Sequence, residues 1–250
     1  MAAANLTQAI FFDLGYTLIN FEGDYQRVTQ ASYLALADEL IRSGLKLDAP
    51  VFITRFNETI SAYYQSRDAD LIERPVEIYL SRVLQAFGYT DTPEEVINQA
   101  LTAMYRLTEG HWRLEDDAIP VLQQLKEYGC RLGMISNAAN GENFNRLIDR
   151  FELRNFFDAI FVSAVEQVRK PDSRIYSRAL KALGVEGSNS LMVGDTLTAD
   201  ILGAQNSGLR AIWITTRENH PDNLSMRDRI IPDAVIRRLT ELPDTLRRLE

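Results

Sequence analysis

Three aspartates indicate where this chain could perform chemistry. Asp13 ends the apolar run QAIFF, Asp195 ends the run SLMVG, and Asp200 follows five residues later. Carboxylates brought close together repel one another unless a cation compensates their charge. Mg²⁺ prefers oxygen ligands, keeps several waters and commonly bridges protein carboxylates to a phosphate. The set therefore predicts a magnesium site, and the sequence offers no cluster of Cys and His for zinc.

Hydrogen-bond donors stand at two further points of the chain. Ser136 and Asn137 end the apolar run RLGMI, and Lys170 lies in the loop after the run AIFVS. A hydroxyl, an amide and an ammonium group can all donate to anionic oxygens. A carboxylate is an established nucleophile for phosphoryl transfer, through an aspartyl-phosphate. Because such catalysis consists mostly of positioning and charge neutralisation, the combination favours phosphoryl transfer with Asp13 as nucleophile.

Short apolar runs would position these side chains. They are rich in Ile, Val and Phe and show little alternation, which is typical of strands buried on both faces. In an open α/β sheet, ligands bind at the carboxyl ends of the strands, where these polar residues stand. The strands are expected at residues 8–12, 131–135, 159–163, 190–194 and 210–215, with a last short one at 234–236.

Amphipathic segments alternate with the later runs. Helices are predicted over residues 118–128, 173–183 and 198–207, whereas the polar stretch 217–230 is expected to be a loop. Gly184, after the second of these segments, suits a helix C-terminus. Alternation of strands and helices predicts an α/β fold with a doubly wound parallel sheet.

The interval between the first two runs breaks this rhythm. Residues 21–112 contain no convincing strand and are expected to form about four helices, of which Gly44, Gly88 and Gly110 stop three. The chain is thus predicted to carry a helical insertion directly after its first strand. The helices are expected at residues 24–43, 49–66, 72–87 and 93–109.

Four motifs in a fixed order give the chain a family resemblance. The segments IFFDLGYTL, ISNA, RKP and GDTLTAD resemble those of the haloacid dehalogenase (HAD) superfamily of aspartate-nucleophile hydrolases, over nearly the whole chain. The insertion matches the helical cap that this superfamily places after its first strand in the subfamily I type. The resemblance implies a Rossmann-like catalytic core of residues 1–20 and 113–250, with a cap of residues 21–112.

The resemblance also implies a role for each acid of the motifs. Asp13 corresponds to the nucleophile and to a metal ligand, and Gly15 would offer its backbone carbonyl to the metal. Asp195 would bind Mg²⁺ directly. Asp200 would bind it through water or orient Lys170, although an acid here also suits the N-terminus of a helix.

The remaining motif residues correspond to the phosphate-binding set of the superfamily. Thr17 stands at the hydroxyl position of the first motif. Ser136 would bind the transferring phosphoryl group, with the backbone of Asn137 close by. Lys170 would neutralise both Asp13 and the phosphate. A small phosphorylated substrate is therefore implied.

One position departs from the pattern of the superfamily's phosphatases. These usually have a second aspartate two residues after the nucleophile, which protonates the leaving alkoxide and later activates water. Gly15 stands there, and Tyr16 occupies the usual glycine position. Proton transfer of this kind typically contributes about 10²–10⁴-fold in rate. We therefore expect slow turnover, a good leaving group, or an acid supplied from elsewhere, for which Glu22, Asp24 and Tyr16 are candidates.

The expected function is a Mg²⁺-dependent phosphatase of a small phosphorylated metabolite, but Gly15 leaves alternatives open. One is a phosphate- and metal-binding regulatory protein with weak or lost turnover. A haloacid dehalogenase would need no metal but an arginine for the halide, for which Arg27 or Arg55 could be proposed. A phosphonate hydrolase would need a Schiff-base lysine, and Lys46 is the one lysine of residues 21–112.

Composition limits the partners. A net charge of −8 disfavours nucleic acid, since that affinity depends on Lys and Arg neutralising phosphates. No stretch approaches the roughly 20 apolar residues of a membrane-spanning helix, and the N-terminal stretch shows no secretory signal. Cys130 is the single cysteine, which fits a reducing compartment. We expect a cytoplasmic protein without a nucleic-acid or membrane partner, and the sequence carries no signal for its oligomeric state.

Overall fold

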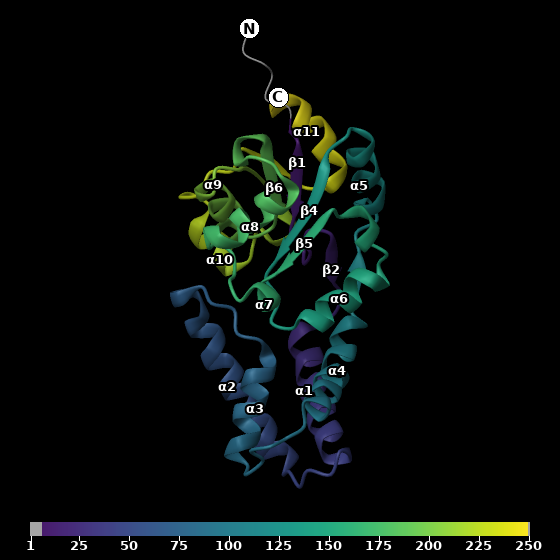
Figure 1. Ribbon diagram of the computed structural model, residues 1–250, viewed down its shortest axis with the longest axis vertical. Helices are drawn as coiled ribbons and strands as arrows, with labels where there is room; N and C mark the ends of the chain where they lie inside the picture. Colours follow the sequence, from purple (N-terminus) through teal and green to yellow (C-terminus); the bar gives the residue numbers. More distant parts are fainter. Residues whose placement is uncertain (1–6, 250) are drawn as a thin grey trace.

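A parallel sheet forms the centre of one half of the molecule (Figure 1). The computed structural model describes residues 7–249. Residues 1–6, which belong to the expected core segment 1–20 and to the N-terminal stretch examined for a secretory signal, lie outside the described residues. Within the described residues the sheet has six strands in the order β5-β4-β1-β6-β7-β8, and every neighbouring pair is parallel. The strands are β1 (Ala9–Phe12), β4 (Arg131–Ser136), β5 (Ala159–Val162), β6 (Ser190–Gly194), β7 (Arg210–Ile214) and β8 (Ala234–Ile236).

The register of the sheet brings the strand ends together. Phe12 of β1 pairs with Met134 of β4 on one side and with Val193 of β6 on the other. The chain runs outward from β1 to β5 and then returns to β6, so the topological switch point adjoins β1. Asp13 follows β1 directly and therefore lies where ligands bind in such sheets.

Helices cover both faces of the sheet, which confirms the predicted doubly wound α/β fold. Side chains of β1 alternate between two clusters: Ile10 and Phe12 pack on one face, Ala9 and Phe11 on the other. The first face is covered by α5 (Ala118–Glu127), α6 (Gly141–Arg150) and α11 (Leu242–Leu249). The second is covered by α8 (Ser173–Leu183), a π-helix (Leu197–Leu202) and α9 (Gly203–Asn206).

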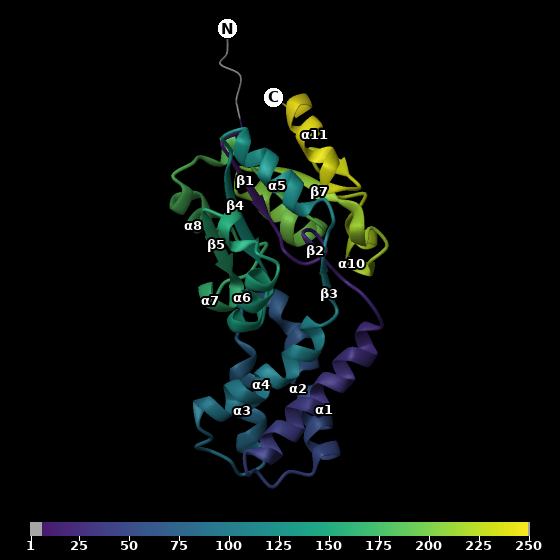
Figure 2. The ribbon, with the colours of Figure 1, turned by 90° about the vertical axis from the view of Figure 1, so that its right-hand side faces the viewer.

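The helical insertion forms a separate bundle beyond the carboxyl ends of the strands (Figure 1). It consists of α1 (Tyr25–Arg42), α2 (Ala49–Asp70), α3 (Val76–Ala86) and α4 (Glu94–Glu109), which share their own buried cluster. An antiparallel pair, β2 (Ile19–Phe21) and β3 (Trp112–Leu114), joins the insertion to the sheet (Figure 2). Both polypeptide connections to the insertion therefore pass through one two-stranded ribbon.

The structure differs from the sequence predictions at short elements. Phe21 and Trp112 extend the ribbon strands into the interval where no strand was expected. Helix α6 was not predicted, because its segment is mostly polar and buries only Phe144, Leu147 and Ile148. The prediction of a loop over residues 217–230 is wrong in part, since α10 (Pro221–Met226) lies within this range. Within residues 7–249, none of the helices combines the length and apolar character that crossing a membrane would need.

Candidate active site

The three predicted aspartates meet at the carboxyl edge of the sheet. Carboxylate oxygens of Asp13, Asp195 and Asp200 lie within 4.8 Å of one another, and all three side chains are buried. Asp13 directly follows β1, Asp195 directly follows β6, and Asp200 lies in the π-helix. The backbone N–H of Asp13 donates to the carbonyl of Val193 at 3.0 Å, which ties the first aspartate to β6.

Lys170 bridges two of these carboxylates. Its Nζ lies 2.7 Å from Asp13 Oδ1 and 2.5 Å from Asp200 Oδ1, and its side chain is buried. Burial opposes the ammonium charge, but Asp13 and Asp200 outweigh that effect and raise the pKa of Lys170. Asn137 fixes the backbone of Lys170, because its side-chain amide donates to the Lys170 carbonyl at 3.0 Å and accepts from the Lys170 N–H at 2.8 Å.

The cluster sets three buried carboxyl groups against one buried lysine. Burial raises the pKa of Asp195 well above its usual value and that of Asp200 to about 6. Asp195 Oδ2 is buried and has no hydrogen-bond partner among residues 7–249, although Arg217 Nη1 lies 3.6 Å away. An orphaned carboxylate oxygen beside two further carboxylates is a donor set that suits a hard divalent cation. The residues present therefore fit a metal site.

Two hydroxyls of the predicted phosphate-binding set are also buried near this edge. Ser136 ends β4, the hydrogen-bonded neighbour of β1. Thr17 is fully buried, and its Oγ1 has no hydrogen-bond partner in the part of the chain that the structure describes. Donors without a protein partner are available to an incoming anionic oxygen.

Sequence reasoning missed three residues that hold Asp195. Trp213 Nε1 and Asn223 Nδ2 both donate to the Asp195 carbonyl at 2.9 Å. Asn223 is buried, also donates to the Arg217 carbonyl, and accepts from Leu197 N–H at 2.9 Å. Arg217 stacks over the Tyr16 ring with its guanidinium carbon 4.5 Å from the ring centroid. An isolated asparagine in a polar segment carries no sequence signal for such a role.

Comparison with known proteins decides the family. A family model described as haloacid dehalogenase-like hydrolase matches residues 7–208. The chain belongs to the haloacid dehalogenase-like hydrolases. It is 28% identical over 208 residues to the glyceraldehyde 3-phosphate phosphatase of Pyrococcus abyssi, covering 83% of this chain and 81% of that relative.

Solved structures support the same fold. A 2-haloacid dehalogenase from Pseudomonas syringae pv. Tomato superimposes with a TM-score of 0.69 at 25% identity, covering 98% of this chain and 100% of that one. A HAD phosphatase from Thermococcus onnurineus gives 0.64 at 22% identity, covering 96% and 97%. The chain is thus a HAD-like hydrolase with neighbours in more than one branch of the family.

Gly15 occupies the position at which HAD phosphatases usually carry their second aspartate, and its neighbour is the Trp112 ring. A Cβ built on Gly15 would lie 3.6 Å from Trp112 Cη2, an ordinary van der Waals contact. The Trp112 ring also meets the Tyr16 ring edge-on, with centroids 5.3 Å apart. The indole of Trp112 therefore borders the space into which an acid at this position would extend.

None of the three candidate replacements for that acid is well suited. Glu22 is exposed and pairs with Arg113 at 3.1 Å. Asp24 caps α1 by accepting the Arg27 N–H at 3.1 Å. Burial raises the pKa of Tyr16, although Arg217 opposes the rise, so its phenol is a weak acid and cannot serve as a base at neutral pH.

Residues proposed for the other HAD branches are exposed, whereas the aspartates are buried. Arg27 and Arg55 are exposed, and Arg55 pairs with Glu58 within α2 at 3.5 Å. Lys46 is exposed in the turn between α1 and α2, at the end of the insertion farthest from the sheet (Figure 1).

Substituting Gly194 by alanine should disturb the aspartate cluster. A Cβ there would lie 2.3 Å from Asp200 Cγ, so the carboxylate must move. Overpacking of this kind typically destabilises by about 1–3 kcal/mol. Urea unfolding should show this loss, whereas Gly110→Ala, whose Cβ meets nothing closer than 3.4 Å, should leave the midpoint nearly unchanged. Equal midpoints for both variants would contradict the expected clash.

Proposed function

We propose that this protein is a Mg²⁺-dependent phosphatase that hydrolyses a small phosphate monoester through an aspartyl-phosphate on Asp13. The buried cluster of Asp13, Asp195 and Asp200, bridged by Lys170, carries this proposal. Similarity to a phosphatase relative over most of both chains supports it. The three converging carboxyl groups, with Asp195 Oδ2 lacking a hydrogen-bond partner among residues 7–249, support a metal-dependent branch of the family over the metal-independent dehalogenases.

The mechanism assigns one task to each group of residues. Asp13 attacks phosphorus, so an O–P bond to its carboxylate forms while the ester O–P bond breaks and the alcohol leaves with a proton from water. A water molecule then attacks the aspartyl-phosphate, which releases inorganic phosphate and restores Asp13. Lys170 neutralises charge on Asp13 and on the phosphoryl oxygens, and Thr17 and Ser136 donate to those oxygens. Asp13, Asp195, the Gly15 carbonyl and Asp200 would hold Mg²⁺, which would supply further charge neutralisation.

The helical insertion has a place in the same proposal. Its four helices lie beyond the strand ends where the aspartates meet (Figure 1). We assign residues 21–112 as a cap that excludes water during transfer, over a core formed by the remainder of the chain. The ribbon of β2 and β3 is the natural hinge because both connections pass through it.

A panel of phosphate monoesters, assayed with Mg²⁺ and with EDTA, tests the proposal. Glyceraldehyde 3-phosphate belongs in the panel because a relative is named for it. We expect Mg²⁺-dependent release of inorganic phosphate from at least one ester. Hydrolysis of none would overturn the proposal.

The second candidate function, which Gly15 favours, is a phosphate- and metal-binding protein of the same family with weak turnover. Without an acid at that position, release of phosphate from Asp13 should be slower than its capture. A burst of one leaving group per enzyme followed by slow turnover would support this candidate. Halide release from a 2-haloacid without metal would instead support the dehalogenase branch, to which a structural neighbour belongs.

Mg²⁺ should stabilise the protein more at pH 7 than at pH 5. Burial raises the folded-state pKa of Asp195 and of Asp200, the latter to about 6, so the folded protein binds more protons than the unfolded chain. The contribution of these two carboxyls to the stability of the metal-free protein should therefore fall as pH rises from about 4 to 6. Saturating Mg²⁺ at pH 7 should raise Tm by roughly 5–10 °C. Scanning calorimetry measures both values, and an equal shift at the two pH values would contradict the prediction.

A further inference from the structure

The segment between α2 and α3 is docked on loops of the sheet. The backbone N–H of Arg169 donates to the carbonyl of Leu71 at 3.0 Å. The backbone N–H of Val76 donates to the carbonyl of Ala139 at 2.9 Å. These two bonds join the insertion to the core outside the β2–β3 ribbon, and they end beside Lys170 and beside the Ser136-Asn137 pair.

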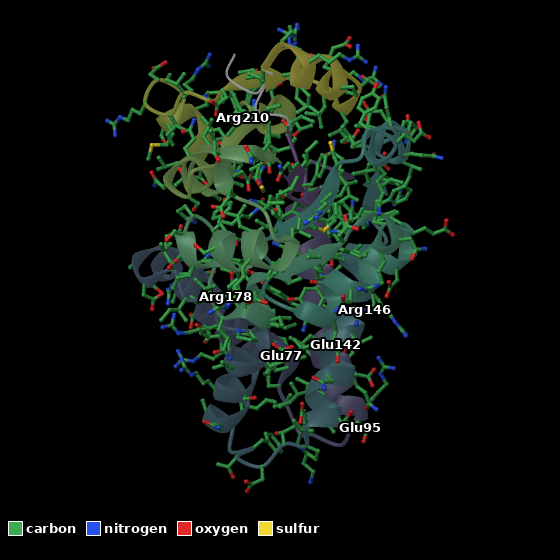
Figure 3. The ribbon with its side chains drawn as sticks, turned by 45° about the horizontal axis from the view of Figure 1, so that its top comes forward. Glu77, Glu95, Glu142, Arg146, Arg178 and Arg210 are labelled. Carbon is green, nitrogen blue, oxygen red and sulfur yellow. The ribbon has the colours of Figure 1, made fainter. Side chains whose placement is uncertain are left out.

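Side chains reinforce the docking next to Val76. Asn140 Nδ2 donates to Glu77 Oε1 at 2.6 Å, and burial raises the pKa of Glu77. On α6, which also appears in Figure 3, Glu142 and Arg146 pair with each other at 3.8 Å. Arg146 in turn pairs with Glu109, at the end of α4, at 2.7 Å. The insertion thus contacts the core along both α3 and α4.

Glu73 lies at the centre of this contact and is 2% exposed. Its Oε1 accepts from the Tyr63 hydroxyl at 2.5 Å, and its Oε2 accepts from the Ser163 hydroxyl at 2.9 Å. Arg169, also buried, places Nε 3.6 Å from Glu73 Oε2. A buried carboxylate needs such partners, because leaving either charge unpaired in a dry contact is strongly destabilising.

The Ser163 hydroxyl connects Glu73 to the loop after β4. Ser163 Oγ accepts from the Ala138 N–H at 2.9 Å. Its single proton has two acceptors within reach, Glu73 Oε2 at 2.9 Å and the Ala138 carbonyl at 3.2 Å. Docking of the insertion therefore determines which acceptor the hydroxyl uses, and so how the Ala138 peptide is held.

The same loops carry the groups that face Asp13. Ala138 follows Asn137, whose side chain clamps the backbone of Lys170, and Lys170 follows Arg169. A displacement at Ala138 or Arg169 is therefore transmitted through one peptide to Asn137 or Lys170. Small misplacements of such groups are costly, since phosphoryl transfer depends on positioning.

We propose that Glu73 is a positioning residue of this enzyme, which holds the loops of Asn137 and Lys170 in reactive geometry when the insertion is docked. It acts through Ser163 and Arg169, without contact to the reacting atoms. Its effect on rate rests on the proposed phosphatase function, whereas its effect on the loops does not. Glu73 thereby couples closure of the insertion to alignment of the site.

Hydrogen–deuterium exchange on the full chain tests the loop effect. Glu73→Gln keeps the size of the side chain but removes the buried one of the two carboxylate charges that face Arg169; the other belongs to exposed Asp68, whose Oδ1 lies 2.9 Å from Arg169 Nη1. The amides of Ala138 and Arg169 should exchange roughly tenfold faster. Their hydrogen-bond acceptors, Ser163 Oγ and the Leu71 carbonyl, are held less firmly once Glu73 loses its charge. The buried cluster of the insertion should keep its protection against exchange.

Glu58→Gln, on the exposed face of α2, is the matched control and should change the exchange of neither loop. Unchanged exchange at Ala138 and Arg169 in folded Glu73→Gln would overturn the proposal.

Kinetics separate a positioning role from a structural one. On any ester that the panel identifies, Glu73→Gln should lower kcat roughly 10–100-fold with KM within about threefold of wild type. The loss in the double variant Glu73→Gln/Ser163→Ala should be smaller than the sum of the two single losses, since part of the Glu73 effect passes through the Ser163 hydroxyl. Fully additive losses would overturn this link. If Glu73→Gln fails to fold, Tyr63→Phe, which keeps every charge and removes only the hydroxyl that donates to Glu73 Oε1, gives the same exchange readout at Ala138.

Discussion

Replacing Asp13 by asparagine should abolish phosphate-ester hydrolysis, with kcat at least roughly 10³-fold below wild type. The amide has nearly the same shape but is a neutral and very poor nucleophile, so no bond to phosphorus forms. Lys170 keeps its 2.5 Å contact with Asp200, so the lysine should stay in place. Steady-state release of inorganic phosphate measures the loss, and intact-mass spectrometry should find no phosphorylated protein.

A matched substitution separates this effect from disruption of a buried aspartate. Asp117, like Asp13, is 8% exposed, and its Oδ2 accepts from the Thr240 N–H at 3.0 Å away from the cluster. Asp117→Asn should therefore keep activity within a fewfold range of wild type. Turnover by Asp13→Asn that matched the Asp117→Asn rate would remove Asp13 from the mechanism.

The parts of the molecule that sequence could predict are those with local signals. The buried strands appear as short runs of Ile, Val and Phe, and a parallel sheet aligns their carboxyl ends. That physical constraint places Asp13 and Asp195 at one edge without any contact being known. Gly44, Gly88 and Gly110 likewise marked where helices of the insertion end.

The rest could not be predicted, because its signals are single residues whose partners lie far away in the chain. Asn223 holds Asp195 from within a polar segment that no periodicity marks as helix. Glu73 meets Ser163 across 90 positions of sequence, and a lone glutamate is most often a solvated surface residue. Such contacts are set by how the insertion docks on the sheet, which no local pattern encodes.

Introducing aspartate at Gly15 should speed capture of the phosphoryl group from alkyl phosphates by roughly 10²-fold, the lower end of what general acid–base catalysis contributes. The new Cβ fits in ordinary contact with Trp112, and Gly15 lacks the left-handed conformation that would strain another residue. The indole would also shield the carboxyl from water, which raises its pKa and keeps it in the acid form near neutral pH. The alkoxide could then leave as an alcohol.

Comparing two kinds of ester and a control variant shows whether this gain in rate comes from proton transfer. An aryl phosphate such as p-nitrophenyl phosphate expels a stable phenolate, so its first step should gain much less than that of an alkyl phosphate. Gly15→Asn has the same size against Trp112 but no transferable proton, and should show no gain on either ester. Burst and steady-state phases, measured separately, report on capture and release of the phosphoryl group. Equal gains for the aspartate and asparagine variants would mean that Gly15 limits the rate through shape and not through the missing acid.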